Sequence, residues 1–270
     1  MFIDSHAHLE GEKFDADREA VISRAREAGL SAILAIGNGE TPEALGCAAR
    51  LAEQYDFIYA TTGIHPHEAQ LATDAAYAEM ERLARHDKVI AWGEIGLDYF
   101  YEHSPKEIQK RVFLRQMELA RAAKLPIVIH CRPSEDSDDA WIDCLALLRE
   151  HWLSSGLGGI MHCFTSTWEN AKASLDMGFL ISFAGNITFP KAQPIRDAAV
   201  RIPLDQVLIE TDCPFLAPVP YRGKRNEPAF VTETARQLGT LHGISPKEVG
   251  ARMSDNFRRF FSLHEKADSI

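Results

Sequence analysis

The chain has 270 residues, of which 46% are apolar and 25% charged, and 39 acidic side chains outnumber 29 basic ones. This composition is typical of a globular protein and excludes a disordered, collagen-like or disulfide-dense chain. The net charge of −10 argues against a protein that coats nucleic acid non-specifically, since such binding depends on a cationic surface. Because the sequence shows no membrane-length apolar run, no secretory signal and only five scattered cysteines, we expect a cytoplasmic protein with no membrane partner.

Short apolar runs typical of strands buried on both faces recur along the chain. They lie at Phe2–Asp4, Ala32–Ile36, Phe57–Thr61, Val89–Glu94, Pro126–His130, Gly159–His162, Phe179–Ser182 and Val207–Thr211.

Helical patterns fill the intervals between these runs. Thr41 and Ser245 are predicted N-caps before proline, Ser166 is predicted to open another helix, and Gly29 to end the first one. Strands that alternate with helices in this way predict an α/β protein, a single (β/α)8 TIM barrel over residues 1–270. A doubly wound sheet is the structural alternative.

Candidate metal ligands follow the predicted strands, and strand ends surround one site in a TIM barrel. His6 and His8 are two residues apart in an extended segment, so they point the same way. The other candidates are Glu94, His130, His162 and Asp212. Six ligands exceed the needs of one tetrahedral ion, which predicts two divalent ions and a bridging carboxylate. Such a pair activates water for attack on phosphorus or on a carbonyl, so the ligands alone leave the substrate open.

Seven segments, in order along the chain, carry a resemblance to a known family. They are Phe2–Leu9, Gly63–His67, Gly93–Tyr99, Ile129–Arg132, His162–Phe164, Glu210–Pro214 and Pro218–Pro228. In these segments the chain resembles the TatD family of metal-dependent deoxyribonucleases, which are amidohydrolase-like barrels.

The resemblance implies one ion between His6, His8, Glu94 and Asp212, and a second between Glu94, His130 and His162. Glu94 would bridge two divalent ions (Mg²⁺, Mn²⁺ or Zn²⁺), and Asp212 would orient or deprotonate the attacking water. The implied reaction is hydrolysis of phosphodiester bonds in DNA, with 3′→5′ removal of nucleotides from single-stranded ends. RNA is an open alternative substrate, and we expect a monomer or weak oligomer.

Three departures from the family pattern stand out. Glu10 replaces the usual aspartate, Cys213 replaces serine or alanine, and the loop Pro133–Asp139 is longer and more acidic than usual. The charges of this loop would repel a phosphate backbone, which bears on substrate size more than on the chemistry.

Several further residues have both a functional and a structural interpretation. His65 and His67 either bind a substrate phosphate or an extra ion, or orient a loop. Arg132, Arg222 and Lys224 either bind phosphate, with Arg225 beside them, or belong to a solvated surface.

Other residues beside the proposed ligands are expected to have supporting roles. Asp4 and Glu210 either orient the histidine ligands or pair strands 1 and 8. Strand alternation turns the three cysteines that directly follow a ligand toward the helices, which favours inert thiols over metal ligands. These cysteines are Cys131, Cys163 and Cys213. The aromatic run Tyr99–Tyr101 either stacks on a base or packs beneath its loop.

Two rival functions stay open. One is a barrel enzyme that hydrolyses a small carbonyl or phosphate substrate; a lysine at a strand end would favour it, and none is found there. The other is a non-enzymatic metal-bound scaffold, against which the intact ligand set argues.

Overall fold

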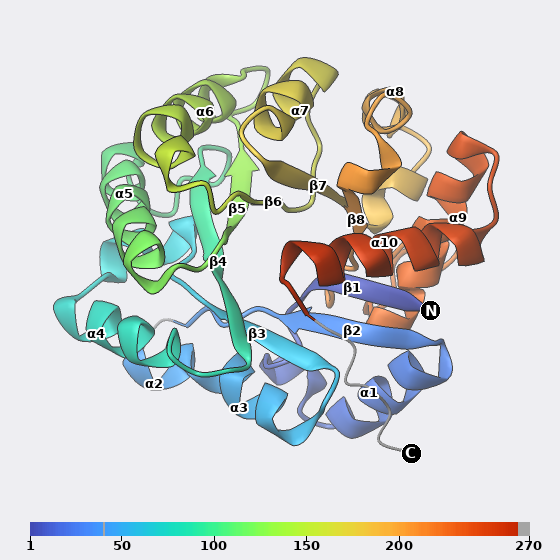
Figure 1. The fold of residues 1–270 in the computed structure, drawn as a ribbon, viewed down its shortest axis with the longest axis horizontal. Coiled ribbons are helices and arrows are strands. Elements are labelled where there is room, and N and C mark those ends of the chain that lie inside the picture. Colours follow the sequence, from blue (N-terminus) through green and yellow to red (C-terminus); the bar gives the residue numbers. More distant parts are fainter. Residues whose placement is uncertain (40, 264–270) are drawn as a thin grey trace.

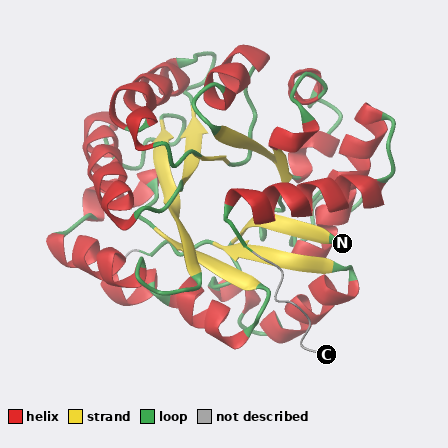
Figure 2. Cartoon of the chain, in the orientation of Figure 1, coloured by secondary structure: helices red, strands yellow, loops and turns green. Residues whose placement is uncertain are grey.

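The computed structural model describes residues 1–39 and 41–263, apart from the side chains of residues 42 and 43. These residues form a parallel barrel of eight strands in chain order, enclosed by helices (Figures 1 and 2). The strands are β1 (Phe2–Ala7), β2 (Leu30–Ala35), β3 (Ile58–Thr62), β4 (Val89–Asp98), β5 (Ile127–Arg132), β6 (Gly159–Met161), β7 (Phe179–Phe183) and β8 (Val207–Ile209). The predicted TIM barrel is confirmed.

The barrel closes where the segment after β8 meets β1. The backbone N–H of Asp212 donates to the carbonyl of His6 at 2.9 Å, and that of His8 donates to Cys213 at 2.8 Å. A doubly wound sheet has a reversal in its strand order and two open edges. That alternative is wrong, because here the strand order is sequential and the first strand meets the last.

Helices cover the outside of the barrel, so its strands are buried on both faces, as their apolar runs predict. Every residue of β7 is buried. The helices are α1 (Arg18–Glu27), α2 (Pro42–Leu45), α3 (Cys47–Gln54), α4 (Asp74–Leu83), α5 (Lys106–Ala123), α6 (Asp139–His151), α7 (Trp168–Leu175), α8 (Gln193–Ala199), α9 (Val231–His242) and α10 (Pro246–Phe260). Within the described ranges, none of them has the length and apolarity of a membrane span.

The helix signals are mostly confirmed. Thr41 and Ser245 are N-caps whose side chains accept backbone N–H bonds, and Gly29 follows α1 with a φ of 87°. The prediction for Ser166 is wrong by one residue: Thr167 caps α7, because its side chain accepts the N–H three residues later. The helix predicted after Thr41 is also interrupted at Gly46, which separates α2 from α3.

The predicted strand ends are wrong at the positions that matter most for the site. β1 continues past Asp4 to Ala7, and β4 continues past Glu94 to Asp98. Glu94 therefore lies inside its strand and not after it. The predicted strands were ended where the apolar run stops. In β1 and β4 the strand continues through polar residues, which are buried at the site and not in the hydrophobic core.

Helix α10 packs at the amino-terminal end of the barrel, in front of the strands in Figure 1. Gly250 lies against Phe2 and the backbone of Met1, and the Asn256 amide donates to the backbone carbonyl of Val207 at 2.8 Å. The carboxyl ends of the strands, where TIM-barrel enzymes place their active sites, lie at the other end and surround a cavity.

Candidate metal centre

The cavity at the carboxyl ends of the strands has a volume of about 830 Å³. This volume lies within the range of about 300–1,000 Å³ that is usual for ligand sites. Five of the six predicted ligands line it: His8, Glu94, His130, His162 and Asp212. The sixth, His6, is fully buried directly beside them.

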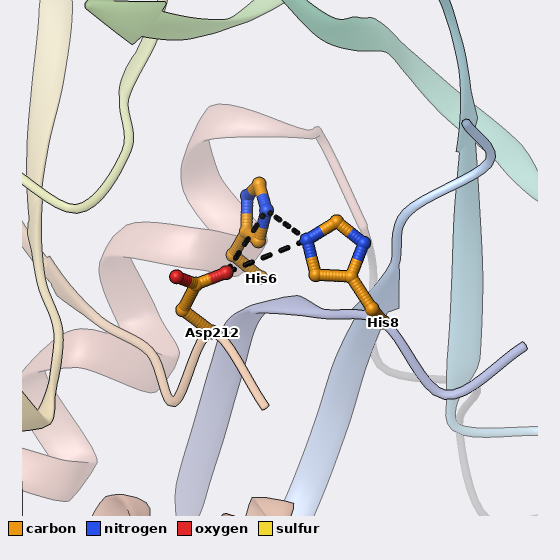
Figure 3. Close-up of side chains that lie close together, drawn as sticks. All are labelled: His6, His8 and Asp212. Carbon is orange, nitrogen blue, oxygen red and sulfur yellow. Dashed lines mark hydrogen bonds and ion pairs between the residues drawn. The ribbon is translucent and has the colours of Figure 1, made fainter. Parts of the chain in front are cut away.

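Four of the predicted ligands converge in a first cluster: His6, His8, Asp212 and Glu94. Figure 3 shows the first three. Nε2 of His6 lies 3.3 Å from Nε2 of His8 and 3.7 Å from Oδ1 of Asp212, and the last two atoms are 3.4 Å apart. The fourth atom, Oε2 of Glu94, lies 3.3 Å from the His6 nitrogen and 3.8 Å from the His8 nitrogen.

These separations fit a single metal ion. Two nitrogens bound about 2.05 Å from a tetrahedral ion are about 3.3 Å apart, which is the edge of the coordination tetrahedron. Four donor atoms have six separations, and the five given above lie between 3.3 and 3.8 Å. Two imidazole nitrogens that face each other can both use their lone pairs only when a cation lies between them. The donor set therefore suits zinc or a similar divalent ion.

The two oxygens of Glu94 face different groups of side chains. Oε2 belongs to the first cluster, and the amide of Asn38 donates to it at 3.4 Å. Oε1 lies 2.8 Å from Nε2 of His162, 2.9 Å from Nδ1 of His130 and 3.6 Å from Nε2 of His65. This is the arrangement that a bridging carboxylate requires.

The second group of donors is less compact than the first. The ligand atoms that lie within 4.8 Å of one another around Glu94 form two sets, one with His6 and His162 and the other with His65 and His130. His130 and His162 thus approach Glu94 in separate sets. His65, predicted as a substrate contact, lies in the position of a further donor.

Buried opposite charges set the protonation of the centre. Burial alone would raise the pKa of Glu94, but the surrounding imidazoles, His162 first among them, hold it well below its usual range. Burial would lower the pKa of His162, but Glu94 and Glu210 raise it well above the usual value. Burial and the neighbouring His162 lower the pKa of His6, which keeps its ring neutral and able to act as a ligand. The centre therefore combines an ionised carboxylate, Glu94, with a neutral imidazole, His6.

Asp98 is a site residue that the sequence analysis missed. Its buried carboxylate lies 3.0 Å from Nε2 of His130 and 2.9 Å from Nε2 of His67, and it accepts the backbone N–H groups of Phe100 and Tyr101. Burial opposes ionisation of Asp98, but these hydrogen bonds outweigh it and lower its pKa. The available signal was strand alternation, since Asp98 lies four residues after Glu94 in β4 and so faces the same side.

Carboxylates outside the clusters contact the histidine rings. Glu210 lies 3.1 Å from Nδ1 of His162, as expected for a residue that orients a ligand. Glu10, which departs from the family pattern, lies 3.6 Å from Nδ1 of His8. Asp4 instead accepts the backbone N–H and hydroxyl hydrogen bonds of Thr211, so it joins β1 to the segment after β8.

Of the predicted cationic contacts, only Arg132 lines the cavity. Arg222 lies over the ring of Phe189, Lys224 lies near Tyr221, and neither is among the lining residues. Arg225 forms an ion pair with Asp17 of the segment before α1. Residues 133–139 of the acidic loop do not line the cavity either.

Two of the three cysteines differ from the expected orientation. Cys213 is fully buried, as predicted, but Cys131 and Cys163 border the cavity. Strand alternation does not apply to Cys163, because β6 ends at Met161 and Cys163 has a φ of 44°. Burial raises the pKa of all three thiols well above the usual value, which keeps them protonated and weakly nucleophilic.

A TIM barrel whose strand ends assemble imidazoles and carboxylates in ligand geometry has the architecture of a metal-dependent hydrolase. Comparison with known proteins agrees. A family model, TatD related DNase, matches residues 3–262. YabD of Bacillus subtilis, described as an uncharacterized metal-dependent hydrolase, is 42% identical over 98% of this chain and 100% of its own length.

A Rahnella protein named 3′-5′ ssDNA/RNA exonuclease TatD is 34% identical over 95% of this chain and 96% of its own. The crystal structure of YjjV, a TatD homologue from Escherichia coli K12, matches with a TM-score of 0.88 at 28% identity, covering 97% and 98% of the two chains. The chain belongs to the TatD-related DNase family and is a metal-dependent hydrolase of ester bonds.

Proposed function

We propose that the enzyme removes nucleotides from single-stranded DNA ends in the 3′→5′ direction, using two divalent ions held on either side of Glu94. The observation that carries this proposal is that the two oxygens of Glu94 face separate donor groups. The name of the Rahnella relative supports the substrate and the direction, and it includes RNA as well as DNA.

The residues that would hold the ions are those predicted from the strand ends. His6, His8 and Asp212 would hold one ion with Glu94, and His130 and His162 the other, each ion being Mg²⁺, Mn²⁺ or Zn²⁺. Two such ions lower the pKa of water and stabilise the attacking and leaving oxygens of a displacement at phosphorus.

Asp212 is the residue we assign to the proton of the attacking water. Burial alone would raise the pKa of Asp212, but the hydrogen bond with His8 and the nearby imidazoles lower it, so the carboxylate is ionised at neutral pH. Its Oδ1 faces His6 and His8, whereas Oδ2 has no hydrogen-bond partner in the described part of the chain (Figure 3). Oδ2 can therefore accept a proton.

The residues that line the cavity include some of those we assign to contacts with the substrate. Arg132 lines the cavity, where its guanidinium lies over aromatic rings, and within residues 1–39 and 41–263 it forms no ion pair with a carboxylate, which suits a phosphate ligand. His65 also lines the cavity and would contact the same phosphate, while Arg222 and Lys224 would contact only a strand that extends beyond the cavity. Among the described residues, no lysine lines the cavity. This supports a nuclease over the barrel hydrolases of small molecules in which a carboxylated lysine bridges the metals.

The candidate ligands all come from a single chain, and the five cysteines are free thiols. We therefore propose a monomer or weak oligomer that works in the reducing cytoplasm.

The test is a time course with a 5′-labelled single-stranded oligonucleotide. Chelator-treated enzyme is supplied with Mg²⁺, Mn²⁺ or Zn²⁺, and Asp212→Asn is compared with Asp176→Asn, an exposed aspartate at the end of α7 that pairs with Lys172. We expect a descending ladder that needs metal and Asp212 but not Asp176. An uncut strand with folded, metal-loaded enzyme would refute the nuclease proposal, as would equal cleavage by Asp212→Asn.

A further inference from the structure

Two half-exposed aromatic rings form part of the cavity wall. Tyr101, in the loop after β4, is 51% exposed, and Phe215, in the segment after β8, is 49% exposed. Tyr99, two residues before Tyr101, has an evident structural role, since it is buried and its hydroxyl donates to Asp143. The Tyr101 hydroxyl has no hydrogen-bond partner among the described residues. Tyr101 also contacts the rings of Phe100 and His103, but it and Phe215 keep about half of their surface exposed, unlike Tyr99.

The two rings lie at opposite ends of the metal centre. In a barrel with sequential strand order, three strands separate β4 from β8 on either side, so the loops after them face each other across the opening. The Phe215 ring lies 6.1 Å from the ring of His8, which belongs to the first cluster. The Tyr101 ring lies 5.6 Å from that of His67, which shares Asp98 with His130. Glu94 lies between the two ends.

Each ring is paired with a cation. The guanidinium of Arg132 lies 4.7 Å from the centre of the Tyr101 ring and 4.1 Å from that of Phe100. The ammonium of Lys13 lies 4.7 Å from the centre of the Phe215 ring. A flat apolar surface beside a positive charge matches a nucleotide, whose base stacks on aromatic rings and whose phosphate pairs with cations.

We propose that Tyr101 and Phe215 form two nucleobase-stacking subsites that hold the bases on either side of the bond to be cleaved. This inference rests on the proposed nuclease function and extends it: the substrate is a strand with two consecutive unpaired, unstacked bases at its end. Duplex ends are poor substrates because their bases are already stacked on each other. Stacking is tolerant of sequence, so the subsites select single strands without selecting a particular base.

The test uses single-stranded oligonucleotides with 2-aminopurine at the last or the penultimate position, whose fluorescence falls when the base stacks. Phosphorothioate linkages at the end slow cleavage during titration with the metal-loaded enzyme. The variants are Tyr101→Leu and Phe215→Leu, with Tyr101→Phe and Phe215→Tyr to retain the rings. Tyr77→Leu is the matched control, because Tyr77 of α4 also lies beside a cation, Arg115, but outside the cavity lining.

We expect the wild type to quench both positions and each leucine variant to lose quenching at one position, a different one for each. Each leucine variant should also weaken binding by about five- to 150-fold, the range for loss of one stacked base. The ring-retaining variants and Tyr77→Leu should behave as wild type. Wild-type quenching in both leucine variants, or a change in only one of them, would overturn the proposal. Cleavage of the unmodified strand by the wild type tests the nuclease function separately.

Discussion

Replacing Asp98 by asparagine removes one charge from the network beside the metal centre and leaves its shape unchanged. In the wild type, one carboxylate oxygen accepts two backbone N–H groups and the other lies 2.9 and 3.0 Å from ring nitrogens of His67 and His130. The asparagine oxygen can keep the backbone bonds, but its NH₂ group then faces both imidazoles.

The size of the effect follows from the two histidine contacts. Hydrogen bonds to a charged group contribute about 1.5–3 kcal/mol each, and a change of tautomer in one imidazole recovers roughly half of the loss. We therefore expect Asp98→Asn to lower the free energy of unfolding by about 1.5–3 kcal/mol, or the melting temperature by about 3–12 °C in a chain of this length. Loss of a partner that orients a ligand should also weaken metal binding by about 10- to 100-fold.

Urea unfolding and calorimetric titration with Zn²⁺ measure both effects. Asp176→Asn is the matched control, since the Asp176 carboxylate is 62% exposed and pairs with Lys172 of α7 on the outside of the barrel. An exposed pair of this kind is worth about 1 kcal/mol or less and should not affect the metal. If Asp98→Asn were as stable as Asp176→Asn and bound zinc as tightly, our account of Asp98 as the residue that orients His130 would be wrong.

Three further predictions concern the metal, a glycine and the carboxylate of the first residue of α6. Chelation should lower the melting temperature by about 5–10 °C relative to enzyme with metal at 100 times its Kd, and no change would contradict the metal centre. Gly96→Ala should cost more than about 3 kcal/mol in urea unfolding, because Gly96 has a φ of 141° and a Cβ would overlap the carbonyl of His130. Gly156→Ala should cost only about 1–2 kcal/mol, since that Cβ meets open space, and equal costs would refute the argument. Burial opposes ionisation of Asp139, but the hydrogen bond from Lys106 and those from the backbone lower its pKa, so its stabilising effect is present above the unfolded pKa of about 4 and is lost as pH falls. Asp139→Asn should therefore lower the free energy of unfolding by about 1 kcal/mol at pH 7 and progressively less below pH 4, and a difference independent of pH would contradict this.

The fold was predictable because barrel strands are buried on both faces. A strand such as β7 is an uninterrupted apolar run, and its extent can be seen without knowledge of its neighbours. The same criterion failed at β4, because Glu94 and Asp98 are polar residues that lie buried within the strand. Both carboxylates contact the ring of His130. Polar residues inside a strand are indistinguishable in sequence from residues of a loop.

Proximity in sequence was a poor guide to the cationic contacts. Arg222 and Lys224 follow Asp212 closely, but the loop leads away from the cavity, and the ion pair of Arg225 with Asp17 holds it against the segment before α1. Arg132 lines the cavity because it lies at the carboxyl end of a barrel strand, the one place where neighbouring elements converge.

The amino-acid sequence alone determined the order and approximate position of the strands and helices and most of the side chains near the strand ends, because these depend on local apolar patterns and on residue identity. Only the tertiary structure decided that the two oxygens of Glu94 face different groups, that Asp98 links His67 to His130, and that Tyr101 and Phe215 border opposite ends of the cavity. Those relations are distances between residues far apart in the chain. They are set by strand register and loop path, which emerge only when the barrel closes.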